Sequence, residues 1–315
     1  MLILWIIVFI VALAVMVKGA DWLISSAEKI GLSLGLSPFI IGVTIVGVGT
    51  SLPELVSSSV AAWQGLPEVV AANAVGSNIA NIFLIIGFAA VLGRKLFVSK
   101  DLIDIDLPLL AISTALLLGV LWDREVTLGE SLLLLVSYGI YFSYTIFHKE
   151  TDGLEKEIGK NISSRPGLVW QDILMLGAGL MGLIFGAKYL IAALVNLSNI
   201  LNIGAGVIAI TAVALGTSLP ELLVSAKAAI SNKPEVALGN IFGSNVFNAL
   251  VVVGLPGLFW RLPVDEQTFL IGLPTMAMAT LLFVISGISR RIYIWEGSFY
   301  LALYILFTAK LFGWF

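Results

Sequence analysis

Two short motifs each occur twice in this chain and carry most of its unusual polar residues. Residues 49–54 and 216–221 both read GTSLPE, while 72–81 read ANAVGSNIAN and 239–248 read GNIFGSNVFN. Both pairs are separated by the same 167 residues. One spacing shared by two different motifs predicts an internal duplication of the chain.

The carboxylates of Glu54 and Glu221 close the two GTSLPE motifs, deep inside apolar stretches that contain no Lys or Arg at similar depth. Other acids, such as Asp106 and Asp172, lie near the ends of apolar stretches, where we expect water to reach them. An ionised carboxylate at membrane depth costs several kcal/mol and usually faces a cavity, a partner or an ion. One such Glu could simply be protonated and hydrogen-bonded, but two at equivalent positions favour a cation site.

Uncharged oxygen atoms accompany both acids. Residues three or four positions apart share a face of a helix, so the polar side chains of each motif should point the same way. Back-bonding to the helix is the alternative for the hydroxyl groups, whereas four Asn residues at membrane depth must find other partners. The residues concerned are Thr50, Ser51, Ser77, Asn78 and Asn81, and in the second copy Thr217, Ser218, Ser244, Asn245 and Asn248.

This donor set predicts the class of ion. The chain has no Cys and a single His, so the usual sulfur and nitrogen ligands of soft metals are missing. Ca²⁺ takes six to eight oxygen ligands, and two carboxylates balance its charge. Na⁺ has a similar radius and accepts the same oxygens. One shared site that binds either ion would suffice for counter-transport.

Composition indicates where such a site must lie. The 315 residues are 59% hydrophobic and only 12% charged, with a mean hydropathy of +1.05. A water-soluble protein carries about 25% charged residues. A net charge of -3 and the absence of Cys also exclude intrinsic disorder, a nucleic-acid-binding surface and a secreted disulfide scaffold. We therefore expect an all-α polytopic membrane protein.

Apolar runs long enough to cross a bilayer, about 20 residues each, predict ten spans. All eight Trp residues fall near the ends of these runs, where indole rings prefer the membrane interface. The predicted spans are 2–17 (with an extension toward Leu23), 38–62, 70–92, 104–121, 126–147, 168–190, 205–230, 237–259, 268–288 and 295–314.

The duplication divides these spans into two groups of five, a first repeat over 1–147 and a second over 168–315. The polar stretch 148–167 is predicted to be a cytoplasmic linker. Because five is odd, the second repeat should be inverted in the membrane, as in many secondary transporters. Thirteen of the 17 Lys and Arg residues lie on one side of this map, which predicts that both termini face outside. A compact chain of this kind suggests a prokaryotic plasma membrane.

At these motifs the sequence resembles the sodium/calcium exchanger family of the cation/calcium antiporter superfamily, particularly its small prokaryotic members. The resemblance covers both repeats, and GTSLPE followed by GSNxxN, twice, is highly specific. It implies ten helices in inverted repeats and exchange of Ca²⁺ for Na⁺ by alternating access. It implies the metal ligands Thr50, Ser51, Glu54, Ser77 and Asn81, and Thr217, Ser218, Glu221, Ser244 and Asn248, with backbone carbonyls near Gly47 and Ala214.

The chain departs from the family at one position. Sodium/calcium exchangers often carry Asp where this chain has Asn248, so the pocket predicted here is symmetric, with two acids. Proton/calcium exchangers usually place a second Glu in the helix that here contains Gly239 and Asn240, which weighs against proton coupling. The resemblance implies no cofactor, no nucleic-acid partner and no obligatory protein partner, only Ca²⁺, Na⁺ and the lipid bilayer.

Three other functions remain open. A proton-coupled calcium antiporter is the nearest alternative, and transport driven by a pH gradient would distinguish it. A cation channel could use the same oxygens, although channels usually assemble their pores from several subunits. A membrane enzyme is disfavoured, because no nucleophile with a neighbouring base is evident in the sequence. The sequence favours an exchanger that acid pH inhibits, since protons compete for the two carboxylates.

Overall fold

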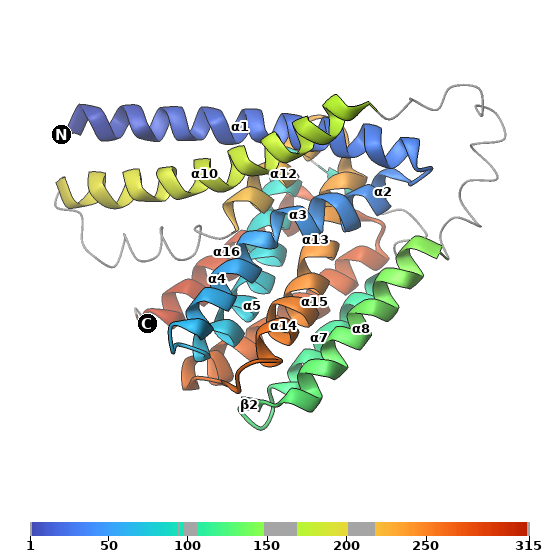
Figure 1. The fold of residues 1–315 in the computed structure, drawn as a ribbon, viewed down its shortest axis with the longest axis vertical. Coiled ribbons are helices and arrows are strands. Elements are labelled where there is room, and N and C mark those ends of the chain that lie inside the picture. The colour runs from blue at the N-terminus through green and yellow to red at the C-terminus, as the bar shows by residue number, and fades with distance from the viewer. Residues whose placement is uncertain (1, 94, 98–105, 148–168, 201–217, 314–315) are drawn as a thin grey trace.

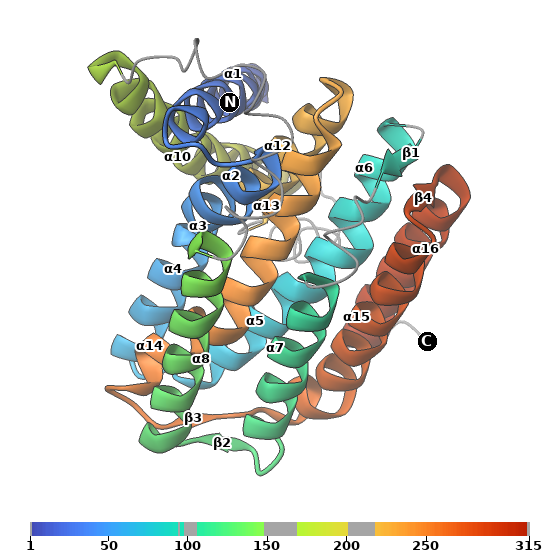
Figure 2. The ribbon, with the colours of Figure 1, turned by 90° about the vertical axis from the view of Figure 1, so that its right-hand side faces the viewer.

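The computed structural model describes residues 2–93, 95–97, 106–147, 169–200 and 218–313. Helices make up almost all of this part of the chain. Two long helices, α1 and α10, lie side by side and cross the end of a bundle that contains the others (Figures 1 and 2). The predicted linker 148–167 lies outside the described residues.

The first half of the chain begins with α1 (Leu2–Ser33), and its later helices follow the predicted spans closely. Two of those spans contain a short π-helical turn, labelled η. The segments are α2 (Pro38–Ile41), η1 (Gly42–Val46), α3 (Gly47–Thr50), α4 (Leu52–Trp63), α5 (Glu68–Ile79), η2 (Ala80–Ile86), α6 (Gly87–Leu92), α7 (Leu107–Val120) and α8 (Leu128–Phe147).

The second half repeats this order where it is described. Residues 201–217, which include the start of the predicted span 205–230, lie outside the described part. The segments are α10 (Trp170–Ile200), α12 (Leu219–Ile230), α13 (Pro234–Phe247), η6 (Asn248–Val252), α14 (Val253–Gly257), η7 (Thr268–Gly272), α15 (Leu273–Ile288) and α16 (Ile294–Leu311).

Six helical stretches in the described part are long and apolar enough to cross a membrane. They begin at Leu2, Pro38, Glu68, Trp170, Pro234 and Thr268. The shorter apolar helix α7 also coincides with a predicted span. The chain is thus a helical protein with several membrane-crossing segments, as its composition indicates.

The predicted end of the first span was wrong, because α1 continues well beyond residues 17–23 to Ser33. The predicted span 168–190 agrees with the apolar stretch Trp170–Leu190, although the helix α10 itself continues to Ile200. Charged residues beyond position 17, the predicted end of the first span, form ion pairs within the protein. The pairs are Asp21 with Lys227 (3.0 Å), Lys29 with Asp172 (3.2 Å) and Glu28 with Lys233.

Each of these ion pairs joins α1 to the second half of the chain and should contribute modestly to stability. We expect Lys233→Met to lower the free energy of unfolding by less than about 1 kcal/mol, because both partners are about one third exposed and the pair is screened by water. Thermal unfolding in detergent at low and high salt would measure the loss, which should shrink as salt rises. Lys188→Met is the control, since no carboxylate pairs with Lys188 among the described residues, and an equal loss there would contradict the assignment.

Four short strands were not part of the all-α prediction. β1 (Lys95–Phe97) pairs with β4 (Arg291–Tyr293), and β2 (Glu125–Val126) pairs with β3 (Leu262–Pro263), both antiparallel. The strands form where the loops between helices run alongside each other, which allows their backbone groups to hydrogen-bond. The two small sheets lie at different ends of the bundle (Figure 2).

The two sheets are related by the same 167-residue shift as the motifs. Adding 167 to β1 gives β3, and subtracting it from β4 gives β2. The register is also preserved, because the pairs Lys95–Tyr293 and Leu96–Ile292 become Leu262–Val126 and Pro263–Glu125. Each sheet therefore contains one strand from each half. The first-half strand of one sheet corresponds to the second-half strand of the other. A two-fold relation between the halves would produce this pattern.

The expectation that water reaches the acids near the span ends was wrong for two of them. Asp106 is 1% exposed and Asp172 is 7% exposed. Asp172 accepts a hydrogen bond from Lys29, and Asp106 interacts electrostatically with Tyr141. Packing of neighbouring helices over these helix starts, which a linear sequence does not show, covers both residues.

Candidate functional site

Two matching helix starts carry the predicted carboxylates. Ser51 separates α3 from α4 with backbone angles φ -89° and ψ 2°, and Ser218 precedes α12 with φ -88° and ψ 7°. A proline follows two positions later in each case, and it is tolerated in a first helical turn because that turn has no N–H partners to lose. Glu54 and Glu221 therefore both lie in the first turn of a helix, where the helix dipole favours negative charge.

The two carboxylates face a common buried region between the halves of the chain. Glu54 is 1% exposed and Glu221 is 0% exposed, and the two interact electrostatically. The hydroxyl of Ser51, from the first half, donates a hydrogen bond of 3.1 Å to Oε1 of Glu221 in the second. Both carboxylate oxygens of Glu54 and Oε2 of Glu221 are buried and have no hydrogen-bond partner among the described residues.

Positive charge to balance these acids is missing from the protein nearby. No Lys or Arg appears among the buried residues of the described part. No group of three or more His, Cys, Asp and Glu side chains that could hold a metal gathers there either. Any cation bound by the two carboxylates must therefore complete its coordination with neutral oxygens.

Four Asn side chains supply such oxygens at the same level of the bundle. Asn78 and Asn81 come from α5 and η2, and Asn245 and Asn248 from α13 and η6, and each is at most 2% exposed. The side chain of Asn81 donates to Oδ1 of Asn245 (3.1 Å), and the side chain of Asn78 donates to the backbone carbonyl of Asn245 (3.2 Å). Within the described residues, Oδ1 of Asn78, Oδ1 of Asn81 and both polar atoms of Asn248 lack hydrogen-bond partners.

The contacts between helices cross from one half to the other. The π-helical turn η6, which starts at Asn248, packs against α4 with Glu54, and η2, which contains Asn81, packs against α12 with Glu221. The two turns occupy equivalent positions, 167 residues apart. Because π-helical turns inside α-helices occur frequently at functional sites, their symmetric placement beside the two acids marks this region as the candidate site.

The remaining predicted ligands lie at or beside this region, where they are described. The Thr50 hydroxyl donates to Oδ1 of Asn240 (3.0 Å), and the Ser244 hydroxyl donates to the Gly47 carbonyl (3.2 Å). Ser77 and Ser218 are each 4% exposed. Thr217 and Ala214 lie outside the described residues.

Sequence reasoning missed two amide side chains next to the acids, one buried and one partly buried. Asn73 and Asn240 each hydrogen-bond the helix that carries one Glu, by way of Ser58 and Ser225 respectively. Both Asn residues lie inside the repeated motifs and are 167 residues apart. The two Ser residues lie just after the GTSLPE motifs and have the same spacing. That shared spacing was the signal that could have found them.

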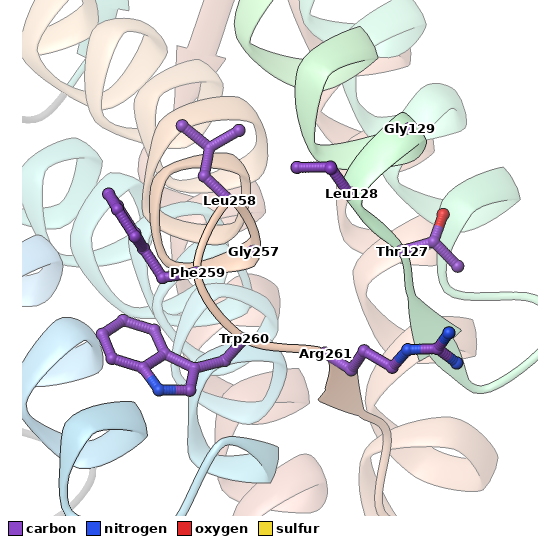
Figure 3. Close-up of a pocket in the computed structure, with 8 residues that line it drawn as sticks. All are labelled: Thr127, Leu128, Gly129, Gly257, Leu258, Phe259, Trp260 and Arg261. Atoms are coloured by element: carbon purple, nitrogen blue, oxygen red, sulfur yellow. The ribbon is translucent and has the colours of Figure 1, made fainter.

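A separate surface pocket of about 330 Å³ lies at the end of the bundle opposite to α1 and α10. It is lined by Thr127, Leu128 and Gly129 from the start of α8, and by residues 257–261. Figure 3 shows Arg261 at its edge below Thr127, and Arg261 pairs there with Glu125 (3.3 Å). None of the predicted ligands lines this pocket.

Comparison with known proteins identifies the family of the chain. The family model described as sodium/calcium exchanger protein matches residues 4–147 and 172–313. Sodium/calcium exchanger MaX1 of Methanosarcina acetivorans is 31% identical over 344 aligned positions, which cover 97% of each protein. Inner membrane protein YrbG of Escherichia coli is 30% identical over 282 positions, which cover 88% of this chain and 86% of that protein.

A similar fold is found among solved structures. The sodium-calcium exchanger NCX_Mj, in crystals soaked with zero Na⁺ and Ca²⁺, superposes on this chain with a TM-score of 0.81. The alignment has 29% sequence identity and covers 99% of this chain and 100% of that chain.

Proposed function

Because this chain belongs to the sodium/calcium exchanger family, we propose that it exchanges Ca²⁺ for Na⁺ across a membrane by alternating access. The site would lie near the middle of the bilayer, between α4 and α12. Thr50, Ser51, Glu54, Ser77 and Asn81, with their counterparts in the second half, would supply the oxygen ligands.

The observation that carries this proposal is the meeting of two buried carboxylates from opposite halves of the chain. Three of their four oxygens have no hydrogen-bond partner in the described part. Burying carboxylate oxygens without a partner is costly unless they bind a cation. Their two charges match Ca²⁺, and the surrounding amide and hydroxyl oxygens suit a hard cation that requires six to eight ligands. Na⁺ accepts the same oxygens, so the two ions would compete for the site.

Alternating access is supported by the symmetry of the structure. The starts of α4 and α12, the two π-helical turns and the two strand pairs are each related by one 167-residue shift. Two inverted repeats of five spans each, joined by the linker 148–167, would account for all three correspondences. In such transporters, rocking of one repeat against the other exposes a fixed central site first to one side and then to the other.

The membrane placement belongs to the same proposal. With ten spans and both termini outside, the excess of Lys and Arg would face the cytoplasm of a prokaryotic cell. Reporter fusions to the two termini would test this orientation, and a terminus found inside would contradict it.

Transport into proteoliposomes distinguishes this function from its alternatives. We expect Ca²⁺ uptake when the vesicles contain Na⁺ and the outside solution does not. A pH gradient of the same size, without Na⁺, should drive little uptake. Uptake driven only by the pH gradient would favour a proton-coupled antiporter.

Saturation and counter-ion dependence test for a channel in the same vesicles. An exchanger requires Na⁺ on the opposite side and saturates with Ca²⁺, whereas a channel requires neither. If more than two Na⁺ replace one Ca²⁺, uptake should also respond to membrane voltage, because each cycle then moves net charge. Uptake that persists without any counter-ion would reject exchange.

A further inference from the structure

We propose that Asn73 and Asn240 are positioning residues of the cation site, which rests on the function proposed above. Each amide fixes the helical turn that carries one of the two carboxylates. Asn240 also contacts the Thr50 hydroxyl, one of the predicted ligands, as a hydrogen-bond acceptor. Neither Asn was among the predicted ligands.

The two amides make the same contacts in the two halves of the chain. Nδ2 of Asn73 donates to the Ser58 hydroxyl (2.9 Å) and to the backbone carbonyl of Glu54 (3.4 Å). Nδ2 of Asn240 donates to the Ser225 hydroxyl (2.9 Å) and to the backbone carbonyl of Glu221 (3.4 Å). All three residues of the first set map onto the second by the 167-residue shift. The same contacts therefore occur in both halves of the chain.

The anchored turn is the one that most needs support. Glu54 and Glu221 each lie in the first turn of a helix, where the helix has fewer internal hydrogen bonds to hold it. An amide from the neighbouring helix ties the main chain of each Glu to α5 or α13. Because ligand geometry must be held within a fraction of an ångström, outer contacts of this kind commonly tune metal binding.

The hydrogen-bonding capacity of each group determines how the Asn240 amide is oriented. The carbonyl of Glu221 can only accept, so the amide atom that faces it must be the Nδ2 donor. Oδ1 of Asn240 then faces Thr50 at 3.0 Å as an acceptor for its hydroxyl, which also has the Gly47 carbonyl (3.4 Å) and the Glu221 carboxylate as acceptors. Whichever of them takes the proton, the Thr50 oxygen keeps its lone pairs for a cation.

Asn240 is suited to positioning rather than to coordination. It is 0% exposed, and both of its polar atoms already have protein partners. Asn248 is equally buried, yet its polar atoms have no partner among the described residues. Asn240 is therefore bonded to protein through both of its polar atoms, whereas Asn248 has both polar atoms available for a ligand.

The test is a double-mutant cycle on Na⁺-driven Ca²⁺ uptake by the full chain in proteoliposomes. We expect Asn240→Ala to raise the half-saturating Ca²⁺ concentration at least about tenfold, as for other residues that orient metal ligands, and to change the maximal rate less than about threefold. In a Thr50→Val background, Asn240→Ala should have a much smaller effect, because it acts partly through Thr50. Asn73→Ala should raise the half-saturating concentration in the Thr50→Val background as much as in the parent.

Asn196→Ala is the matched control, since the Asn196 amide donates to the Ala192 carbonyl of its own helix. It should leave the half-saturating Ca²⁺ concentration unchanged. Asn73 is only partly buried, so Asn73→Ala keeps the proposal testable if Asn240→Ala does not fold. A role in folding alone would lower thermal stability and maximal rate without changing the half-saturating concentration, and this result would overturn the proposal.

Failure of this proposal is distinguishable from failure of the proposed function. If the parent chain shows no Na⁺-dependent Ca²⁺ uptake, the proposed function is wrong. If the parent exchanges the two ions but the Asn73 and Asn240 variants keep its half-saturating concentration, only the positioning role is wrong. Equal effects of Asn240→Ala with and without the Thr50 hydroxyl would reject the link through Thr50.

Discussion

Replacing Glu221 or Glu54 by Gln is expected to reduce Na⁺-driven Ca²⁺ uptake to below about 1% of the parent rate, while the protein still folds. Gln keeps the size of the side chain but removes one of the two negative charges that would balance Ca²⁺. Losing about 3 kcal/mol of ion binding lowers affinity roughly a hundredfold. Uptake into proteoliposomes measures the effect directly.

Stability measurements separate this loss from misfolding. A buried carboxylate without a partner is costly, so both variants should be at least as stable as the parent when no Ca²⁺ is present. Ca²⁺ should raise the unfolding temperature of the parent, because it binds the folded state, and should fail to do so in either variant.

Glu130→Gln is the matched control for these variants. Glu130 accepts hydrogen bonds from the backbone N–H and the hydroxyl of Thr127, at the start of α8 and away from the site. Its replacement should cost less than about 1 kcal/mol of stability, because the Gln amide oxygen can still accept these bonds, and leave exchange intact. Full Ca²⁺ flux in folded Glu54→Gln or Glu221→Gln would show that these carboxylates do not bind the transported ion.

Replacing Gly243 by Ala is expected to have the second largest effect. A Cβ atom at Gly243 would overlap the backbone carbonyl oxygen of Val43 and lie 2.8 Å from its carbon. This contact joins α13 to η1 and lies one residue from Ser244, whose hydroxyl donates to Gly47. The backbone of η1 would have to move away, so the cost should reach at least about 3 kcal/mol and the two halves of the site should separate.

Thermal unfolding and size-exclusion profiles in detergent would measure the loss of folded protein. Gly139→Ala is the control, because Gly139 lies on the exposed side of α8 and an added Cβ there meets no atom within 4 Å in the described part. Ala favours helix over Gly by about 1 kcal/mol, so this variant should be unchanged or slightly more stable. A Gly243→Ala protein as stable and active as the parent would contradict the close packing of α13 on η1.

The sequence indicated which buried polar residues lie together better than it indicated where the first helix ends. Glu54 and Glu221 could be identified because their chemistry is conspicuous in an apolar run and because the motif occurs twice. The structure brings them together with the Asn residues of the second motif. Which of the ten predicted ligands bind an ion stays a prediction.

Features that depend on contacts between distant segments could not be predicted in this way. Asp21 and Glu28 lie beyond position 17, the predicted end of the first span, yet they pair with Lys227 and Lys233 and α1 continues. The role of Asn240 depends on Ser225 and on Thr50, 190 residues away in sequence. A linear pattern contains the residue types but not these pairings, except where the duplication repeats them.

An anomalous-scattering map from crystals of the protein grown with Ca²⁺ would test the central claim most directly. We expect one strong peak between the carboxylates of Glu54 and Glu221, within about 2.3–2.6 Å of an oxygen from each, and a weaker peak when Na⁺ is in excess. A Ca²⁺ peak elsewhere in the molecule, or none within reach of either carboxylate, would contradict the claim that these two residues hold the transported ion.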